Sequence, residues 1–477
     1  MIKSLAPVLA VAVALLASAA PSAASAEPLR QAAGGLTTEE VSFTDGDLTL
    51  HGTITAEPAA QGQRRPGLVL VGGSGPGPRT DYLHEAAAFA HAGMVVLSYD
   101  KRTVGYSTTH RDFSVLADDA LAGLRTLQAR ADVEPTRIGL WGFSEGGWVA
   151  PLAASRSADV GFLVLVGANG FAPARQQGWE LANYLRHSGA SDSVVRAMSY
   201  TGVRFAAGAG LFPEANYDPV PVLERVHQPV LALWGGRDVL TPPEESPPII
   251  RQALERGGNT HYTMRFFAEG RHNLHRSPDG FVRTDELVPG YVDAVGAWVG
   301  DLASGLPQPS VADLPHQDSR TVELPPLAWY ESVPVQLAAL ALFLVVFGGY
   351  PVVALVRRLR GRRGQPSVRW PARLLSAAGL AVTVGFAVVF VLVNGTLSAG
   401  PVLGGRTVLW LLLQLLVLVA IGSTVGTAIA LWRRRGRAQP GSAQLGSAEP
   451  GRVRPALLVV AGVVLVPWAA YWGLLSP

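Results

Sequence analysis

Short apolar runs recur along the first three hundred residues and alternate with segments of helical periodicity. Residues 48–55, LTLHGTIT, alternate apolar and polar positions, as a strand with one buried face does. Five further runs are almost continuously apolar, which is typical of central strands in a parallel sheet covered on both faces. These runs are Gly67–Val71, Met94–Tyr99, Arg137–Trp141, Phe162–Val166 and Pro229–Trp234.

Helical patterns fall between these runs. Residues 114–130, SVLADDALAGLRTLQAR, predict a helix with Ser114 as its N-cap. Strands that alternate with helices predict a doubly wound, mostly parallel α/β sheet. In such sheets ligands bind beyond the carboxyl ends of the strands, so the loops that follow the apolar runs are the ones to inspect.

The composition changes abruptly after Glu331, where four long apolar runs follow one another. Each run is long enough to cross a bilayer core of about 30 Å at about 1.5 Å per residue. None contains Asp, Glu, Lys, Arg or His, which disfavours a transporter and favours an anchor. We therefore predict a transmembrane domain at residues 333–477 with four helices, at 333–356, 374–393, 408–432 and 456–475.

Arginines indicate how this domain is oriented. Seven lie between the first and second spans, six between the third and fourth, and one between the second and third. The positive-inside rule then predicts that the residues before 333 are extracytoplasmic. Residues 1–26 independently resemble a cleaved signal peptide that ends in Ala24-Ser25-Ala26, with an uncleaved N-terminal anchor as the alternative. We expect a multi-pass protein of the cell membrane.

Composition narrows the remaining classes. The chain has no cysteine, which excludes disulfides, a thiol nucleophile and Cys-ligated zinc. Residues 27–331 contain 24 basic and 35 acidic residues, a formal net charge of −11, so no basic footprint for nucleic acid is present. We divide this part into an α/β domain at 27–301 and a Pro-rich linker at 302–332. An insertion at about 170–226, rich in aromatic residues, is interpreted as a helical lid.

One turn suggests the chemistry. The apolar run that ends at Trp141 leads into Gly142-Phe143-Ser144-Glu145-Gly146, and a helical segment follows. Such a sharp strand-to-helix turn needs glycines two before and two after the serine that it exposes. The sequence therefore predicts Ser144 as a nucleophile, although a Gly-rich chain also produces this motif by chance.

A serine nucleophile needs a base and an orienting carboxylate, in the order Ser, Asp or Glu, His for this kind of fold. Asp238 follows the strand at 229–234, and His272 follows a predicted strand at 261–267. Glu244 or Glu245 remains an alternative to Asp238, and His275 an alternative to His272. The spacing HNLH lacks the signature of a metal site, and we expect no metal and no cofactor.

Acyl transfer also needs backbone donors for the oxyanion. We predict the N–H of Glu145, directly after the nucleophile, and the N–H of Ser74 in the loop VGGSGPGPRTD, with Gly73 as the alternative. A phosphate-binding function of this loop is disfavoured, because the Lys-Ser/Thr pair of such loops is missing.

Taken together, the segments GGSGP (72–76), DKRTVGYS (100–107) and GFSEGG (142–147) resemble the α/β-hydrolase superfamily, in particular its bacterial esterase and serine-peptidase-like members. The resemblance covers about residues 41–299. Two positions depart from the family pattern: Gly72 stands where many relatives have histidine, and Thr103 replaces a glycine. The resemblance implies structural roles for Asp100 and Arg102.

The favoured function is a membrane-anchored serine esterase that acts on a small ester. A peptidase that acts on short peptides and an acyltransferase with the same triad remain alternatives, as does a non-catalytic domain of this fold with a binding or sensory role. Glu180 and Glu214 are candidates for binding a substrate amine, as acidic cap residues do in aminopeptidase-type relatives. The sequence predicts the lipid bilayer as a partner, no nucleic acid, and no particular protein partner.

Overall fold

The computed structural model describes residues 35–107, 109–361, 370–398, 400–435 and 450–476. The predicted signal peptide lies outside these residues. By its contacts the chain divides into two compact units. The first comprises the described chain up to Glu180 and Gly210–Glu323, and the second comprises Leu181–Ala209 and the described chain from Leu324 onward.

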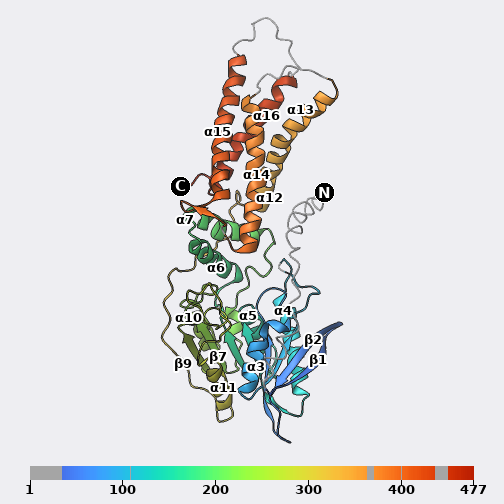
Figure 1. Ribbon diagram of the computed structural model, residues 1–477, viewed down its shortest axis with the longest axis vertical. Coiled ribbons are helices and arrows are strands. Elements are labelled where there is room, and N and C mark those ends of the chain that lie inside the picture. Colours follow the sequence, from blue (N-terminus) through green and yellow to red (C-terminus); the bar gives the residue numbers. More distant parts are fainter. Residues whose placement is uncertain (1–34, 108, 362–369, 399, 436–449, 477) are drawn as a thin grey trace. The chain divides into compact units, whose positions relative to one another are not determined.

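The first unit is built on a nine-stranded sheet with the order β1-β2-β4-β3-β5-β6-β7-β8-β9 (Figure 1). The first two strands form an antiparallel hairpin, β2 pairs antiparallel with β4, and the other pairs are parallel. The strands are β1 Thr37–Asp45, β2 Leu48–Ala56, β3 Arg65–Val71, β4 Val95–Tyr99, β5 Val133–Phe143, β6 Phe162–Val166, β7 Val230–Gly235, β8 Tyr262–Phe267 and β9 Ser310–Val311.

Helices cover both faces of the sheet and create two apolar cores. One core joins α4, α5, α9 and α10 to one face, and the other joins α3 and α11 to the opposite face. Alternate side chains of the central strands enter opposite cores, Val69 the first and Leu70 the second. The helices are η1 Arg79–Tyr82, α3 Leu83–His91, α4 Phe113–Gln128, α5 Gly146–Ala154, α9 Val220–Leu223, α10 Ser246–Arg256 and α11 Tyr291–Asp301.

The start of α4 differs from the prediction. Asp112 is the N-cap, and its side chain accepts hydrogen bonds from the backbone N–H of Ser114 (2.7 Å) and Val115 (3.4 Å). Ser114 instead lies in the first turn. The prediction of a Ser114 cap was wrong because both residues are good caps, and sequence alone does not select between them.

The segment predicted as a linker packs in part against the first unit. Its residues Ser310–Val311 form β9 at the edge of the sheet. Further along, Gln317 exchanges hydrogen bonds with Glu244, and the backbone N–H of Thr321 donates to Glu245 at 2.8 Å. The first part of this segment is therefore held in place rather than free.

Among its described residues, the second unit contains four helices that are long and apolar enough to cross a membrane: Val333–Leu359, Trp370–Thr396, Val408–Arg433 and Val453–Tyr471. The first of these consists of α12 Val333–Phe343, the π-helical segment η3 Leu344–Gly348 and α13 Gly349–Leu359. The others belong to α14 Trp370–Thr396, α15 Val408–Arg435 and α16 Pro450–Tyr471. A short hairpin of β10 Val402–Leu403 and β11 Arg406–Thr407 precedes α15.

The middle of the insertion belongs to this second unit. The insertion is helical, with α6 Pro173–His187, α7 Asp192–Val195, the π-helical η2 Arg196–Gly202 and α8 Val203–Gly208. The ring of Phe205 lies 5.5 Å from that of Trp472 and 6.4 Å from that of Phe390, centroid to centroid. The sequence assigned the whole insertion to the α/β domain, whereas the contacts of Leu181–Ala209 are with the apolar helices.

Candidate active site

Ser144 occupies the turn between β5 and α5. Its φ of 55° lies in the left-handed region, which non-glycine residues adopt rarely and mostly where the surroundings enforce it. The backbone N–H of Ser144 donates to Val166 O of the neighbouring strand β6 at 3.0 Å. A Cβ on Gly146 would lie 2.1 Å from Val71 O, so only glycine allows α5 to start this close to β3. The turn therefore has the geometry that the motif predicts.

Asp238 and His272 lie in the loops that follow β7 and β8. His272 Nδ1 donates to Asp238 Oδ2 at 2.8 Å, and both side chains are buried. Asp238 Oδ1 accepts hydrogen bonds from the backbone N–H of Leu240 and of Thr241, each at 2.8 Å. These three bonds fix the carboxylate, and the carboxylate in turn fixes the orientation of the imidazole.

The imidazole of His272 lies near Phe143, the residue that precedes Ser144. The His272 ring is 5.0 Å from the ring of Phe143, centroid to centroid, and a Cβ on Gly167 at the end of β6 would lie 2.8 Å from His272 Cε1. His272 Nε2 is buried and has no hydrogen-bond partner among the described residues. The fold thus brings Ser144, Asp238 and His272 to the carboxyl ends of β5, β7 and β8, with an unpaired imidazole nitrogen.

The alternative residues have other partners. His275 is fully buried, with Nε2 at 3.2 Å from Glu85 Oε1 and Nδ1 at 3.0 Å from Thr284 O. Glu244 and Glu245 bind the segment around Gln317. The two histidines of HNLH therefore have different carboxylate partners, and neither rival glutamate is bonded to His272.

The backbone N–H groups predicted as oxyanion donors differ in whether they already donate a hydrogen bond. Gly73 N–H, the alternative, donates to the hydroxyl of Tyr82 at 2.8 Å. Within the described chain, the N–H groups of Ser74 and Glu145 donate to no other residue. Tyr82 also explains the departure at Gly72, because a Cβ there would lie 2.6 Å from its hydroxyl oxygen. Burial raises the pKa of Tyr82 to about 12, so this hydroxyl remains protonated at neutral pH.

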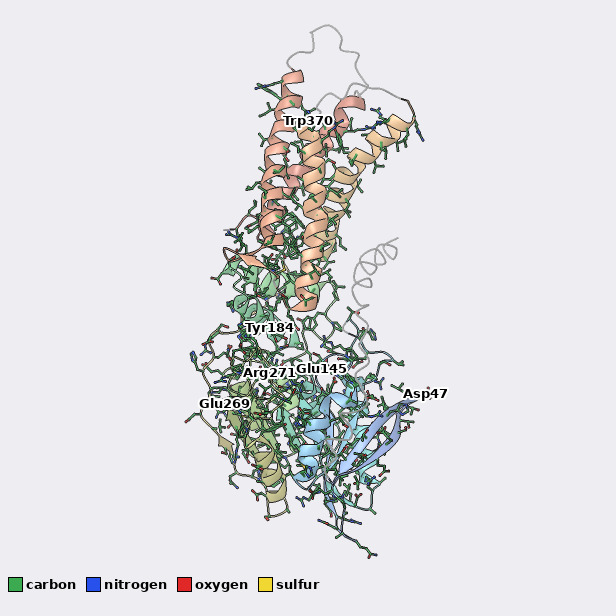
Figure 2. The ribbon with its side chains drawn as sticks, in the orientation of Figure 1. Asp47, Glu145, Tyr184, Glu269, Arg271 and Trp370 are labelled. Carbon is green, nitrogen blue, oxygen red and sulfur yellow. The ribbon has the colours of Figure 1, made fainter. Side chains whose placement is uncertain are left out.

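Sequence reasoning missed a buried cluster of polar side chains beneath Ser144. The carboxylate of Glu145 is fully buried and accepts hydrogen bonds from Lys101 Nζ (2.8 Å), Tyr106 OH (2.8 Å) and Arg111 NH1 (3.0 Å). Glu145 is labelled in Figure 2 and belongs to the first unit. The motif predicts a role for the backbone N–H of Glu145 only. It contains no signal for the partners of the Glu145 side chain.

The residues read as structural from the family pattern are engaged in ion pairs. Arg102 donates to Asp119 through two bonds of 2.7 and 2.6 Å and to Asp45 at 2.7 Å. Asp100 accepts from the backbone N–H of Arg79 at 2.8 Å and from its guanidinium at 2.5 Å. These contacts connect the loop after β4 to the hairpin β1–β2, to α4 and to η1.

Of the two acidic residues singled out in the insertion, Glu180 lies near the imidazole. Burial raises its pKa to about 7, against the opposing effects of a hydrogen bond from Gln176 at 3.0 Å and of the His272 charge. Gln176 also donates to Leu240 O at 2.6 Å, beside Asp238. Glu214 instead lies near Arg111 and Asp112, and burial raises its pKa as well.

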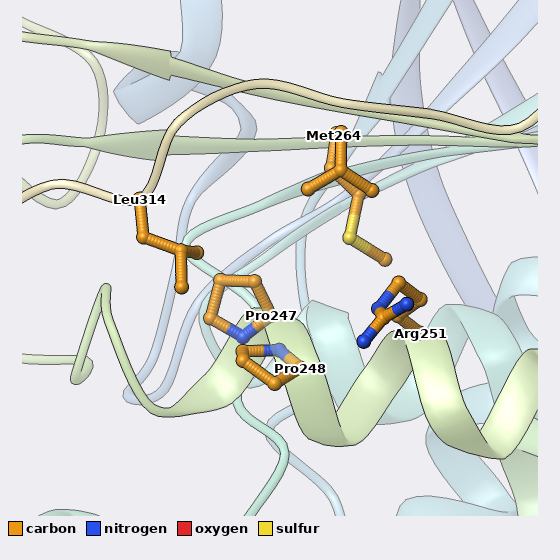
Figure 3. A pocket seen from close by; sticks show the side chains of 6 residues that line it. Pro247, Pro248, Arg251, Met264 and Leu314 are labelled. Atoms are coloured by element: carbon orange, nitrogen blue, oxygen red, sulfur yellow. The ribbon is translucent and has the colours of Figure 1, made fainter.

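A separate hollow of about 270 Å³ lies between α10 and the strands β8 and β9 (Figure 3). Its lining offers one charged side chain, Arg251, which pairs with Glu255 at 3.5 Å. The other lining residues are Pro247, Pro248, Met264, Val311 and Leu314. None of the predicted catalytic residues lines this hollow.

Residues 80–288 match the prolyl oligopeptidase family model, and this range includes Ser144, Asp238 and His272. The first unit has an α/β-hydrolase fold. No curated protein matches the chain in sequence. The predicted fold class is confirmed: an α/β-hydrolase fold followed by a helical domain with four apolar helices.

Solved structures show similarity at low identity to this hydrolase domain. Dipeptidyl peptidase 4 of Porphyromonas gingivalis is 17% identical over 55% of this chain and 35% of its own, with a TM-score of 0.39. Acylaminoacyl peptidase of Pyrococcus horikoshii is 20% identical over 53% of this chain and 40% of its own, with a TM-score of 0.38. The chain thus spans well under half the length of either. A dienelactone hydrolase-like promiscuous phosphotriesterase from metagenomic libraries is 16% identical over 57% of this chain and 100% of its own, with a TM-score of 0.38.

Proposed function

We propose that this chain is a membrane-anchored serine hydrolase that cleaves carboxylic esters outside the cytoplasm. Ser144 is the nucleophile, His272 the general base and Asp238 the residue that orients His272. The observation that carries the proposal is the pair His272 Nδ1–Asp238 Oδ2, at 2.8 Å, in which His272 Nε2 has no hydrogen-bond partner among the described residues. Ser144, held at a φ of 55°, follows another strand of the same sheet.

The reaction follows from these positions. His272 Nε2 takes the proton of Ser144 Oγ as that oxygen attacks the acyl carbonyl, and then gives it to the departing alcohol. An acyl-enzyme on Ser144 remains. Water attacks it with His272 again as base, which releases the acid and restores the serine. Asp238 stabilises the imidazolium formed in each step.

The negative charge on the carbonyl oxygen needs donors that are already in place. We assign this role to the backbone N–H groups of Ser74 and Glu145, because neither donates to another described residue. Gly73 is less suited than the sequence suggested, since its N–H is bonded to Tyr82.

Location rests on the four apolar helices and on the arginine distribution. Seven and six arginines lie in the first and third segments between the spans predicted from the sequence, against one in the second, which supports a cytoplasmic position for the first and third segments. The hydrolase domain is then extracytoplasmic. The bilayer is the partner of the helical domain, and the substrate is a small ester.

A peptidase with the same triad is the second candidate. The match of residues 80–288 to the prolyl oligopeptidase family favours it. Glu180, buried near His272, is an acidic group of the kind that binds a substrate amine. Transfer of the acyl group to an alcohol, instead of to water, is a third outcome of the same acyl-enzyme.

The test uses the full chain in lipid nanodiscs, because Leu181–Ala209 packs with the apolar helices and a fragment without them would expose this surface. A fluorophosphonate probe is expected to label the wild type and to leave Ser144→Ala and His272→Ala unlabelled. The chain offers a matched control in Ser42 and His51, an exposed pair whose Oγ and Nδ1 are 2.9 Å apart. Labelling that survives Ser144→Ala but is lost in Ser42→Ala/His51→Ala contradicts the assignment.

Substrate class is decided on the same preparation. Hydrolysis of 4-nitrophenyl butyrate and of aminoacyl 4-nitroanilides is measured for the wild type and Ser144→Ala. Ser144-dependent ester hydrolysis without anilide hydrolysis supports the esterase. Anilide hydrolysis at a comparable kcat/KM supports the peptidase, and a product that appears only with an added alcohol supports the acyltransferase.

A further inference from the structure

Four side chains below the nucleophile turn form one buried unit, which we call the Glu145 cluster: Lys101, Tyr106, Arg111 and Glu145. All three partners donate to the Glu145 carboxylate, at 2.8, 2.8 and 3.0 Å. The side chain of Glu145 has no exposed area, and that of Lys101 is 8% exposed. A carboxylate this deeply buried is stable only because cations and donors surround it.

The cluster also binds the loop that supplies the predicted oxyanion donor. Lys101 Nζ donates to Gly73 O, and the backbone N–H of Gly75 donates to Tyr106 OH at 3.0 Å. These two bonds flank Ser74 on both sides. The N–H of Lys101 adds a third tether, to Gly77 O at 3.1 Å.

Two elements far apart in sequence are thereby connected through two side chains. Glu145 follows Ser144 directly, and the loop around Ser74 follows β3. Lys101 and Tyr106 contact both, and the Lys101 ammonium also lies 4.9 Å from the centroid of the Tyr106 ring. Any displacement of the β3 loop relative to the nucleophile turn would break the hydrogen bonds that Lys101 and Tyr106 make, and both side chains are buried, so water does not readily replace those bonds.

Composition gives independent support for Lys101. The chain contains 39 lysines and arginines, and only Lys3 and Lys101 are lysines. All the other residues counted here, from residue 4 onward, are arginines. A compact ammonium with three donors can reach Gly73 O, Glu145 Oε1 and Tyr106 OH at once, whereas a planar guanidinium is larger and directs its donors in a fixed fork.

We propose that Lys101 and Tyr106 are positioning residues that clamp the Gly73–Gly75 loop to Glu145 and so hold the Ser74 and Glu145 N–H groups together as one oxyanion site. This inference rests on the proposed serine-hydrolase function. The clamp acts on the transition state, because the carbonyl oxygen gains its charge only there.

The variants Lys101→Met and Tyr106→Phe remove the clamp with little change in volume. Lys101→Met leaves Glu145 paired with Arg111, so no unpaired charge is buried and the chain is expected to fold. Tyr217→Phe is the matched control, since the Tyr217 hydroxyl is buried with no hydrogen-bond partner among the described residues. Lys101→Arg keeps the charge and tests the need for a compact donor.

The measurement is kcat and KM for 4-nitrophenyl butyrate per fluorophosphonate-titrated site, together with Ki for a trifluoromethyl ketone. The ketone forms a tetrahedral adduct with Ser144 and reports on the oxyanion site. We expect kcat to fall about 10- to 100-fold in Lys101→Met, Lys101→Arg and Tyr106→Phe, with KM within about threefold, since one such donor is worth about 10²–10³. Ki is expected to rise by the same factor as kcat/KM falls, and Tyr217→Phe to match the wild type.

The possible outcomes distinguish a failure of the clamp hypothesis from a purely structural effect of the variants and from a failure of the proposed function. A loss of titratable sites with unchanged kcat and Ki per site overturns the inference, because it indicates a structural role only. Full activity of Lys101→Arg overturns the need for a compact donor. A wild type that neither labels nor turns over contradicts the proposed function instead. Deuterium exchange of the 72–77 amides then still tests the clamp, since it must rise in Lys101→Met and Tyr106→Phe.

Discussion

Arg204 of the insertion and Glu331, just before the first apolar helix, lie 127 residues apart in sequence and form a buried bidentate ion pair. Arg204 NH1 donates to Glu331 Oε1 at 2.9 Å and NH2 to Oε2 at 2.8 Å. The guanidinium also donates to the carbonyls of Pro325 and Pro326, at 2.8 and 2.9 Å. Each of its three nitrogens thus donates to the stretch between Pro325 and Glu331.

Removing one partner of this pair is expected to destabilise the helical unit. Arg204→Met leaves Glu331 buried without its cation, and the loss of one partner of a buried pair costs about 3–5 kcal/mol. The unfolding temperature in detergent should fall by several degrees for Arg204→Met and for Glu331→Gln, and the double variant should lose less than the sum.

The control for this prediction is Arg276→Ala, because Arg276 pairs with Glu269 and Glu286 at the surface, where such pairs contribute little. A shift of the same size in the control would show that the pair Arg204–Glu331 has no special role. The Arg204 hydrogen bond lowers the pKa of Glu331, so the pair stabilises the protein fully above the ordinary glutamate range and loses this effect as the pH falls.

The assignment of the acid is tested by amide substitutions. Asp238→Asn preserves size but removes the charge that orients and stabilises His272, and we expect kcat to fall about 10³- to 10⁴-fold. Glu244→Gln alters a carboxylate that binds Gln317 and Arg320 instead, and kcat should stay within about threefold of the wild type. Equal losses in both variants would contradict the role of Asp238.

The sequence predicts the central strands well because parallel strands buried on both faces require continuous apolar runs. β6 begins and ends at the predicted residues, and β3, β4 and β7 differ by at most two residues. The strand β1 escaped notice because its side chains are mostly exposed, as its burial along TTEEVSFTD shows. Such a strand has no apolar run, and its pairing with β2 gives it its structure.

The candidate site likewise contains residues that the sequence predicts and residues that it does not. The positions of Ser144, Asp238 and His272 follow from strand ends and turn chemistry, which are local. The partners of Glu145 and the division of the insertion depend on contacts across tens to hundreds of residues, and no local pattern encodes them. The lysine at 101 is the one compositional signal that sequence alone offered for the Glu145 cluster.

The tight start of α5 gives a steric prediction. Gly146→Ala places a Cβ 2.1 Å from Val71 O, a backbone atom that has no freedom to move aside. We expect a lower unfolding temperature and slower fluorophosphonate labelling, because the displaced helix start shifts Ser144. Gly300→Ala is the control, since a Cβ there meets nothing within 4 Å and alanine favours a helix. Unchanged labelling in Gly146→Ala would contradict the close packing.

Glu180 gives a pH-dependent prediction. Its pKa in the folded protein is about 7, above the ordinary value of 4.5, because burial disfavours the charged form. Between these two values the folded state binds more protons than the unfolded state, so stability falls as the pH rises from about 4.5 to about 7. The loss attributable to Glu180 is at most roughly 3 kcal/mol and is fully present above pH 7.

Glu180→Gln removes this titration while it preserves size and the hydrogen bond with Gln176. The variant should therefore match the wild type near pH 4.5 and exceed its unfolding temperature at pH 8, with the difference developing between. The charges that act on Glu180 are those of His272 and Asp238, so the comparison is repeated in Asp238→Asn, where removal of a like charge should narrow the difference. Glu323→Gln, at an exposed side chain, is the control. A difference between Glu180→Gln and wild type that does not change with pH would contradict the raised pKa.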